Sequence, residues 1–219
     1  MKIIELKETI TASNDRDAEI LRGELKAQKT LLVNLMASPG AGKTTLLERT
    51  IRDLCGRYRI AVMEADVDSD VDAKRIEALG AKAVQAHTGG MCHMDAGMTR
   101  RALEELDAPD SDLVILENVG NLICPAEFDT GAAKNVMLLS IPEGDDKPLK
   151  YPLMFSTSDV LILTKIDVLP YFDFDLDACK ARAKKLNPTI EIFTVSSKTG
   201  EGMADWEAWL SDAIDRHNA

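Results

Sequence analysis

The sequence has little of what marks secreted, membrane-embedded or nucleic-acid-binding proteins. Its 219 residues include only 4 cysteines, widely spaced and without a preceding signal peptide, so a disulfide-rich secreted scaffold is excluded. No stretch approaches the roughly 20 apolar residues of a membrane span. Basic residues (26) are outnumbered by acidic ones (37), and the net charge of −11 disfavours binding to nucleic acid or to an anionic membrane. We therefore expect a cytoplasmic protein with reduced thiols.

Short apolar runs alternate with helical patterns along the chain. The run TLLVNLMA (30–37) is apolar almost throughout, as expected for a parallel strand buried on both faces. Further strands are predicted at 59–66, 82–88, 112–118, 135–140, 159–165 and 190–195. Helices are predicted at 43–56, 70–80, 94–106, 175–187 and 202–216. This alternation predicts an α/β fold with a mostly parallel sheet and helices on both faces.

An additional helix is predicted at 14–29, in front of the first strand. Ser13 or Asn14 is a suitable N-cap, acidic residues fill the first turn, and lysines occupy the last turn. We predict an N-terminal extension at 1–29, followed by one compact unit at 30–219. The plain interpretation of the extra helix is packing, and a role in association is the alternative.

The stretch ASPGAGKTT (37–45) follows the first strand and opens a helix, as in a phosphate-binding (Walker A) loop. Backbone N–H groups surround the phosphates in such a loop, so its side chains must be small or absent. Lys43 is expected to reach the β- and γ-phosphates, and the Thr44 hydroxyl to bind Mg²⁺. The residues predicted to bind the nucleotide phosphates are Gly40, Ala41, Gly42, Lys43, Thr44 and Thr45.

Two acidic strand ends are candidates for the catalytic centre. Glu117 ends the strand LVILE in ENVG (117–120) and is predicted to bind Mg²⁺, while the Gly120 N–H is suited to sense the γ-phosphate. In EADVDSD (64–70), Asp66 is predicted to organise Mg²⁺ or the attacking water, and the alternative is a solvated acidic turn. The catalytic candidates are Lys43, Asp66, Glu117 and Gly120, and the magnesium candidates are Thr44, Asp66 and Glu117.

The segment TKID (164–167) indicates recognition of guanine. Guanine presents two neighbouring N–H donors, and the carboxylate of Asp167 accepts both, whereas adenine lacks this pair. The aliphatic part of Lys165 is suited to lie across the base. A backbone amide of SSK (196–198) is placed to contact guanine O6. These features favour GTP over ATP, with Thr164, Lys165, Asp167, Ser197 and Lys198 as the base-binding residues.

A cysteine and a histidine are adjacent in GGMCHMDAG (89–97), and Cys124 follows ENVG by four residues. The loops that hold them follow parallel strands and gather at one edge of the sheet. Two thiolates and an imidazole from Cys92, His93 and Cys124 suit Zn²⁺ or Ni²⁺. Three ligands leave the site incomplete, so water or a second subunit must complete it. His87 could support the metal ligands from outside, but the favoured interpretation is a strand-end histidine.

In this order, SPGAGKTT, GGMCHMDA, ENVGNLICP, EGDDKPLKYP and TKID resemble the HypB family, GTPases that assist nickel insertion into [NiFe] hydrogenase. The resemblance implies the fold of the dimer-forming P-loop GTPases, a class that includes signal-recognition and metallochaperone members. It implies a homodimer controlled by nucleotide, with a Zn²⁺/Ni²⁺ site at the dimer face from Cys92, His93 and Cys124. The implied partners are a HypA-like nickel chaperone and the hydrogenase large subunit.

Some features differ from the family pattern, and three rival functions remain. Thr164 stands where the guanine motif usually has asparagine, and the CxxCGC nickel motif of some members is lacking. Urease nickel-delivery GTPases carry a Cys-Pro-His motif that is absent from this sequence. An ATP-dependent kinase needs a lid with arginines, and the only tight arginine pair is Arg100–Arg101. A non-enzymatic, zinc-stabilised dimer is the third rival. The resemblance places the loop at 143–152 at the dimer face.

Overall fold

The computed structural model describes the backbone of residues 6–66 and 71–219 and the side chains of residues 12–65 and 75–219. Within these residues, seven strands form one sheet in the order β3-β2-β4-β1-β5-β6-β7, and all neighbouring strands are parallel. The strands are β1 (Leu31–Ala37), β2 (Ile60–Asp66), β3 (Lys82–His87), β4 (Leu113–Glu117), β5 (Lys134–Ser140), β6 (Val160–Thr164) and β7 (Glu191–Val195). The predicted α/β class with a parallel sheet is confirmed.

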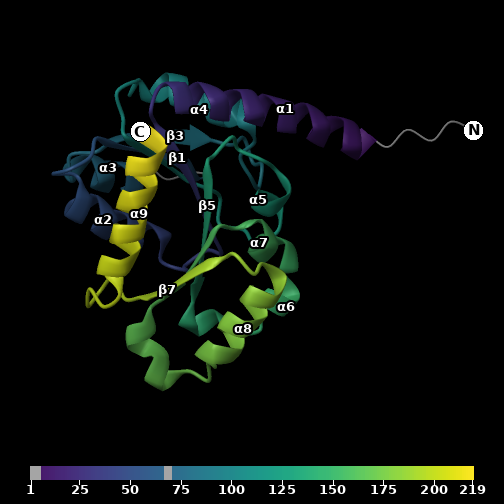
Figure 1. Ribbon diagram of the computed structural model, residues 1–219, viewed down its shortest axis with the longest axis vertical. Helices are drawn as coiled ribbons and strands as arrows, with labels where there is room; N and C mark the ends of the chain where they lie inside the picture. Colours follow the sequence, from purple (N-terminus) through teal and green to yellow (C-terminus); the bar gives the residue numbers. More distant parts are fainter. Residues whose placement is uncertain (1–5, 67–70) are drawn as a thin grey trace, which may run out of the picture.

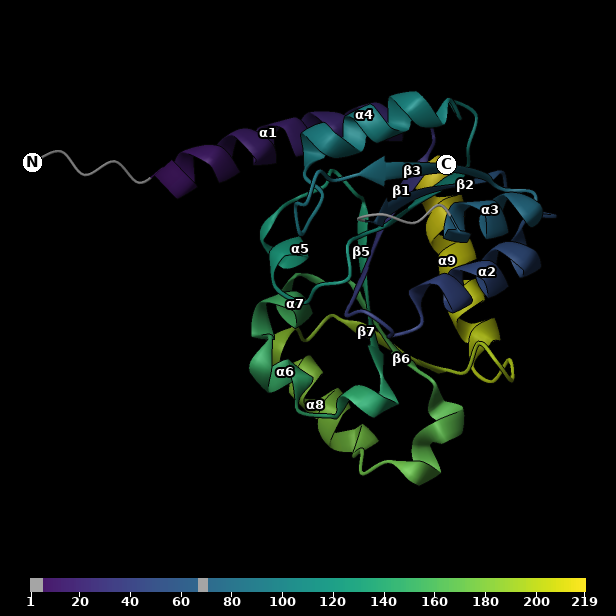
Figure 2. The same ribbon diagram turned by 180° about the vertical axis from the view of Figure 1, so that it is seen from behind.

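Helices cover both faces of this sheet (Figures 1 and 2). The α-helices are α1 (Leu6–Ala27), α2 (Lys43–Leu54), α3 (Val71–Ala78), α4 (Ala96–Leu106), α5 (Cys124–Glu127), α6 (Lys147–Lys150), α7 (Pro152–Thr157), α8 (Leu176–Leu186) and α9 (Met203–Asn218). Two 3₁₀ helices, η1 (Ile141–Glu143) and η2 (Ile166–Tyr171), follow β5 and β6.

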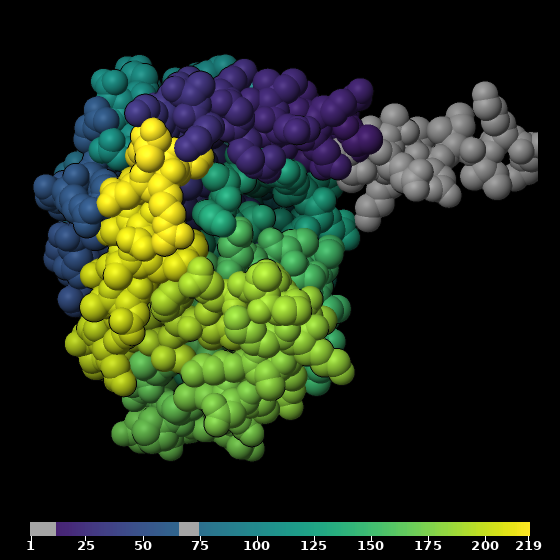
Figure 3. All heavy atoms as spheres, in the orientation of Figure 1, coloured from purple at the N-terminus to yellow at the C-terminus, as the bar shows by residue number. Residues whose placement is uncertain are grey.

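Alternate residues of the strands supply the cores on the two faces of the sheet. Val33 and its neighbours on one face pack against α2, α3 and α9, with Trp206 of α9 as the largest buried side chain there. The other face is divided in two. Helices α1 and α4 cover β2 and β4, where Leu21 meets Met63 and its neighbours, while α7 and α8 cover β5 and β6 around Phe155. In Figure 3, α1 lies across the top of the molecule, above α9.

Most predicted boundaries agree with the structure to within two residues, but the start of the first helix does not. Helix α1 begins at Leu6, so Ser13 and Asn14 lie inside it and neither caps it. The capping rule reads only local sequence, whereas the Asn14 side chain is engaged by distant parts of the chain. Helices α5, α6 and α7 were not predicted, because four to six residues are too few to show a helical period.

The loop after β7, which is predicted to contact the base, depends on a glycine at the start of α9. Gly202 has a φ of 71°, and a Cβ atom there would lie 1.9 Å from the Thr194 carbonyl oxygen. We expect Gly202→Ala to lower the free energy of unfolding by more than about 1 kcal/mol, because both backbone strain and the clash oppose the native turn. Urea denaturation followed by circular dichroism measures this change.

Gly23 is the matched control, because it lies inside α1, and a methyl group added there would meet no other part of the protein within 4 Å. Gly23→Ala should raise the free energy of unfolding by about 0.5–1 kcal/mol, since alanine favours the helix. Equal stability of the two variants would contradict the role assigned to Gly202.

Candidate functional site

The loop predicted to bind phosphate lies after the central strand β1 and opens α2. Gly40 and Gly42 have φ values of 76° and 97°, a backbone conformation that side chains disfavour. Gly42 is the N-cap of α2 and offers no side-chain acceptor to the first turn. The N–H groups of this turn therefore have no capping side chain from Gly42, and such a helix start binds anions. The backbone geometry fits a phosphate group.

Two of the predicted magnesium ligands meet beside this loop. The Thr44 hydroxyl donates to Glu117 Oε1 at 3.2 Å. Both residues line a cavity of about 370 Å³, together with Lys43 and Gly120. A hydroxyl and a carboxylate oxygen are ligands that Mg²⁺ prefers. The donor set at the end of β4 and the start of α2 therefore fits a magnesium ion held between protein and phosphates.

Sequence reasoning missed Glu64, which lines the same cavity. In the register of β2 and β4, Glu64 lies opposite Glu117, and it is only 3% exposed. A buried carboxylate is far more informative than a buried apolar residue, because its burial is costly without a compensating interaction. The signal was present in the sequence as a glutamate inside the apolar strand IAVMEAD.

The fourth catalytic candidate, Asp66, has a side chain outside the described residues. Its backbone ends β2 and is paired in register with His87, the last residue of β3. The role of Asp66 in magnesium or water binding therefore remains a prediction. His87 is exposed at the strand end, in line with its interpretation as a strand-end histidine.

Gly120 lies against the phosphate loop. A Cβ atom on Gly120 would lie 3.0 Å from Cγ and 3.2 Å from the backbone nitrogen of Pro39. Just before it, the buried Asn118 side chain donates to Asn34 Oδ1 at 3.0 Å and accepts from the Met94 N–H at 3.3 Å. Met94 directly follows the adjacent cysteine and histidine. One asparagine therefore joins the strand end beside the phosphate loop to the loop that holds Cys92 and His93.

The predicted base-binding residues surround a second cavity, of about 230 Å³. Asp167 is held in place by the Ser196 hydroxyl, which donates to Oδ1 at 2.8 Å. The two cavities share the phosphate loop, because Gly42 lines one and Gly40 lines the other. The cavity is lined by Gly42, Thr45, Thr164, Lys165, Asp167, Val168, Ser197 and Lys198.

Thr164 and Lys165 tie this second cavity to the phosphate loop. The Thr164 hydroxyl donates to the Ala41 carbonyl at 2.7 Å, and Lys165 Nζ donates to the Gly40 carbonyl at 2.6 Å. Lys165 has a φ of 61°, an uncommon conformation for a residue with a side chain. Thr164 thus makes a tether to the phosphate loop at the position where the guanine motif usually has asparagine.

The two predicted metal-binding thiols lie close together. A hydrogen bond with the Cys124 thiol, and then burial, raise the pKa of Cys92 above its ordinary value. Cys92 Sγ lies 3.8 Å from His93 Nδ1. The His93 ring stacks on Phe128, with ring centroids 3.8 Å apart, and burial lowers the pKa of this histidine. Burial thus favours the neutral imidazole, which is the form that binds a metal.

The three predicted metal ligands are neighbours rather than a closed site. Among the side chains that the structure describes, no group of three or more His, Cys, Asp or Glu residues is arranged to hold a metal ion. Phe128, which sequence reasoning did not identify, fixes the plane of the His93 ring. Two exposed apolar side chains, Met91 and Ile123, directly precede Cys92 and Cys124.

The loop at 143–152 also reaches the phosphate loop, a contact that the sequence did not predict. The Ser38 hydroxyl donates to Glu143 Oε1, and the N–H and hydroxyl of Ser140 donate to Glu143 Oε2 at 2.8 and 2.7 Å. Leu149 and Leu153, further along the same segment, are 65% and 46% exposed. Glu143 therefore connects an exposed apolar segment to the residue that follows β1.

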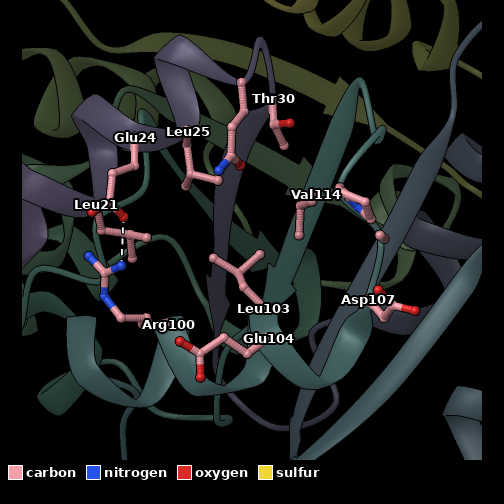
Figure 4. A pocket seen from close by; sticks show the side chains of 12 residues that line it. Leu21, Glu24, Leu25, Thr30, Arg100, Leu103, Glu104, Asp107 and Val114 are labelled. Carbon is pink, nitrogen blue, oxygen red and sulfur yellow. Dashed lines mark hydrogen bonds and ion pairs between the residues drawn. The ribbon is translucent and has the colours of Figure 1, made fainter.

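The arginine pair relevant to a kinase is not at the phosphate loop. Arg100 lies on α4 and pairs with Glu24 of α1 at 2.6 Å, as the dashed line in Figure 4 shows. Arg101 follows it on the same helix and is exposed. Among the described helices, none is long and apolar enough to cross a membrane.

Comparisons with known proteins agree with this geometry. Residues 31–194 match the family described as CobW/HypB/UreG, nucleotide-binding domain. The hydrogenase maturation factor HypB of Azotobacter chroococcum mcd 1 is 49% identical over 210 residues, which cover 95% of this chain and 68% of the relative. The hydrogenase/urease maturation factor HypB of Helicobacter hepaticus is 43% identical, over 93% of this chain and 85% of the relative.

Solved structures show the same relationship. The crystal structure of HypB from Helicobacter pylori in complex with nickel has a TM-score of 0.88 and 38% identity, covering 94% of this chain and 97% of that one. The 54 kDa protein of the signal recognition particle from Aeropyrum pernix, with GDP, has a TM-score of 0.57 at 14% identity, over 97% of this chain and 57% of that one, and shares the fold alone. The predicted P-loop fold class is confirmed, and this chain belongs to the HypB family of hydrogenase maturation factors.

Proposed function

We propose that this protein binds and hydrolyses GTP and couples that cycle to the delivery of nickel to [NiFe] hydrogenase. The observation that carries the proposal is the buried side chain of Asn118, which joins the segment beside the phosphate loop to the loop of Cys92 and His93. The proposed nucleotide site and the proposed soft-ligand site therefore share one hydrogen-bonded connection. The nickel-bound relative from Helicobacter pylori supports nickel as the cargo.

The base-binding cavity supports GTP as the nucleotide. The Asp167 carboxylate, oriented by Ser196, matches the two adjacent N–H donors of guanine. Hydrolysis would depend on positioning and charge neutralisation by Lys43 and by a magnesium ion held by Thr44, Glu117 and Asp66. When bound, Mg²⁺ would neutralise part of the negative charge of the phosphates. Without an evident general base among these residues, we expect slow intrinsic turnover.

A homodimer is proposed as the form that holds the metal. Cys92, His93 and Cys124 supply two thiols and an imidazole, which suit Ni²⁺ or Zn²⁺ but leave the coordination incomplete. The exposed Met91 and Ile123 beside the thiols favour contact with a second copy of this chain. Free thiols at such a site require a reducing compartment, which supports a cytoplasmic location.

The proposed partners are a HypA-like nickel chaperone as the nickel source and the hydrogenase large subunit as the recipient. Urease maturation is the second candidate function, because relatives such as that from Helicobacter hepaticus are named for both enzymes. A kinase is disfavoured, since Arg100 is engaged by Glu24 and lies on α4 rather than beside the phosphate loop.

The coupled cycle predicts that nucleotide and metal together control the mass of the protein in solution. Light scattering with a non-hydrolysable GTP analogue and one equivalent of Ni²⁺ should show a dimer, and GDP without metal a monomer. Cys92→Ala should abolish the effect of the metal, because one thiol ligand is lost. Cys55→Ala, which removes an exposed thiol at the far end of α2, is the control. A dimer mass that is the same with the GTP analogue and with GDP would favour the zinc-stabilised dimer instead.

Recognition of guanine predicts a defined change of specificity in Asp167→Asn. An asparagine offers one donor and one acceptor, so it matches the N1–H and O2 of xanthine rather than the two donors of guanine. GTP affinity should fall by about 10- to 150-fold, from the loss of hydrogen bonds to a charged group, and affinity for the xanthine nucleotide should rise. Titration with fluorescent nucleotides tests this. Unchanged GTP affinity would contradict the base assignment.

The contact of Gly120 with Pro39 predicts that Gly120→Ala disturbs the phosphate loop. The added methyl group must displace backbone atoms of Pro39 by a few tenths of an ångström. We expect the affinity for a GTP analogue to fall roughly tenfold or more, because misplacement of this size is costly at phosphate sites. Gly56→Ala, at a position with open space around it, should bind like the wild type. Equal binding by both variants would show that the loop accommodates the methyl group.

A further inference from the structure

Helix α1 makes side-chain hydrogen bonds to both segments that adjoin the candidate metal ligands. The Asn14 side chain is in the centre of these contacts. Its Oδ1 accepts from the Ala96 N–H at 3.0 Å, and its Nδ2 donates to the Asp129 carbonyl at 2.9 Å. Ala96 lies three residues after His93, and Asp129 directly follows Phe128, on which the His93 ring stacks. One amide group thus spans the two loops.

The bond to Asn14 gives the Ala96 N–H an acceptor that the helix itself does not provide. Ala96 is the first residue of α4, and its N–H has no partner within the helix. The N-cap residue Asp95 accepts from the Met98 N–H, so Asn14 supplies the acceptor that Ala96 lacks locally. The start of α4, and with it the end of the loop that holds Cys92 and His93, is therefore fixed by a residue of α1.

The second loop is held more strongly. Arg22 Nη2 donates to both carboxylate oxygens of Asp129, at 2.8 and 2.7 Å, and Arg22 Nε donates to the Ala132 carbonyl at 3.0 Å. Gly131 packs so closely on Leu21 that a Cβ atom would lie 2.8 Å from its Cδ2. Helix α1 therefore fixes the segment that leads away from Cys124 and Phe128.

We propose that α1 holds the two loops that carry the candidate metal ligands in a fixed arrangement. Asn14 is the positioning residue that sets the placement of Cys92 and His93 relative to Cys124. This inference rests on the proposed function of these three residues as nickel ligands. Asn14 does not touch the ligands and acts through the backbone of the two loops. Groups that hydrogen-bond directly to metal ligands typically change metal affinity by about 10- to 100-fold, and we expect the lower end of this range for Asn14, which acts through the backbone.

Helix α1 makes other contacts with the body of the protein besides those of Asn14, so we expect it to stay in place when Asn14 is replaced. Leu21 and Leu25 are buried, at 3% and 6% exposed, and Glu24 pairs with Arg100 of α4. Figure 4 shows these side chains between the two helices, around a cavity of about 360 Å³. Figures 1 and 2 both show α1 lying along α4. Replacement of Asn14 therefore removes the bridge between the loops while the helix keeps its apolar contacts.

The experiment measures Ni²⁺ affinity of the full chain by the nickel–thiolate charge-transfer absorption, with GDP affinity and melting temperature measured on the same samples. Asn14→Ala should weaken Ni²⁺ binding by about tenfold or more and alter the absorption band, while GDP affinity stays at the wild-type value. Asn14→Asp keeps an acceptor for Ala96 but loses the donor to Asp129, so its Ni²⁺ affinity should be intermediate. Ser13→Ala, at the exposed neighbouring position, should behave like the wild type.

Two results would overturn the proposed positioning role of Asn14. One is equal Ni²⁺ affinity in the wild type, Asn14→Ala and Asn14→Asp. The other is a parallel loss of GDP affinity, melting temperature and Ni²⁺ affinity, which indicates a general structural role. Failure of the proposed function would look different: Cys92→Ala would then bind Ni²⁺ as tightly as the wild type, whatever residue stands at position 14.

Discussion

The hydrogen bond between the side chains of Asn118 and Asn34 connects the interior of the sheet to both candidate sites. Each residue is only 1% exposed, and Asn34 in turn donates to Asn135 on the next strand at 3.0 Å. Amides from β5, from β1 and from the end of β4 thereby form one hydrogen-bonded row, which is buried at Asn34 and Asn118 and partly exposed at Asn135. Loss of a partner in such a row leaves a buried polar group unsatisfied, at a cost of about 1–3 kcal/mol. The segment before Gly120 is therefore held firmly at its base.

The phosphate loop is the meeting point of several otherwise separate segments. Gly120 approaches it from β4, Glu143 from β5 and Lys165 from β6, each through a contact with one of its residues. Because β1 is central in the sheet, its loop has neighbours on both sides. Asn118, two residues before Gly120, is hydrogen-bonded to the backbone of the loop that holds Cys92 and His93, and Glu143 begins the segment with exposed leucines. The strand order brings the segments after β4, β5 and β6 close to the phosphate loop, and Glu143 and Lys165 then make hydrogen bonds to it.

Much of the fold and part of the candidate site followed from the sequence, for a common reason. The phosphate loop, TKID and ENVG each sit at the end of an apolar strand, so the local pattern and the parallel topology together place them. Asn14 was misinterpreted as a cap, because its partners Ala96 and Asp129 are more than 80 residues away. Glu143 was missed for the same reason: its contact with Ser38 depends on neighbouring strands that are distant in sequence. Local rules do not report tertiary partners.

The close contact between Gly131 and Leu21 fixes how α1 can lie on the body of the protein. Asn14, Ala18, Leu21 and Leu25 follow one stripe of the helix, at the spacing of an amphipathic surface. A slip of one residue would turn that stripe by about 100°, from 3.6 residues per turn, and would move a different side chain against the glycine. Because Gly131 has no side chain, it leaves room for Leu21 in the observed alignment of α1. The position of α1 on the protein therefore depends on a glycine more than 100 residues away in the sequence.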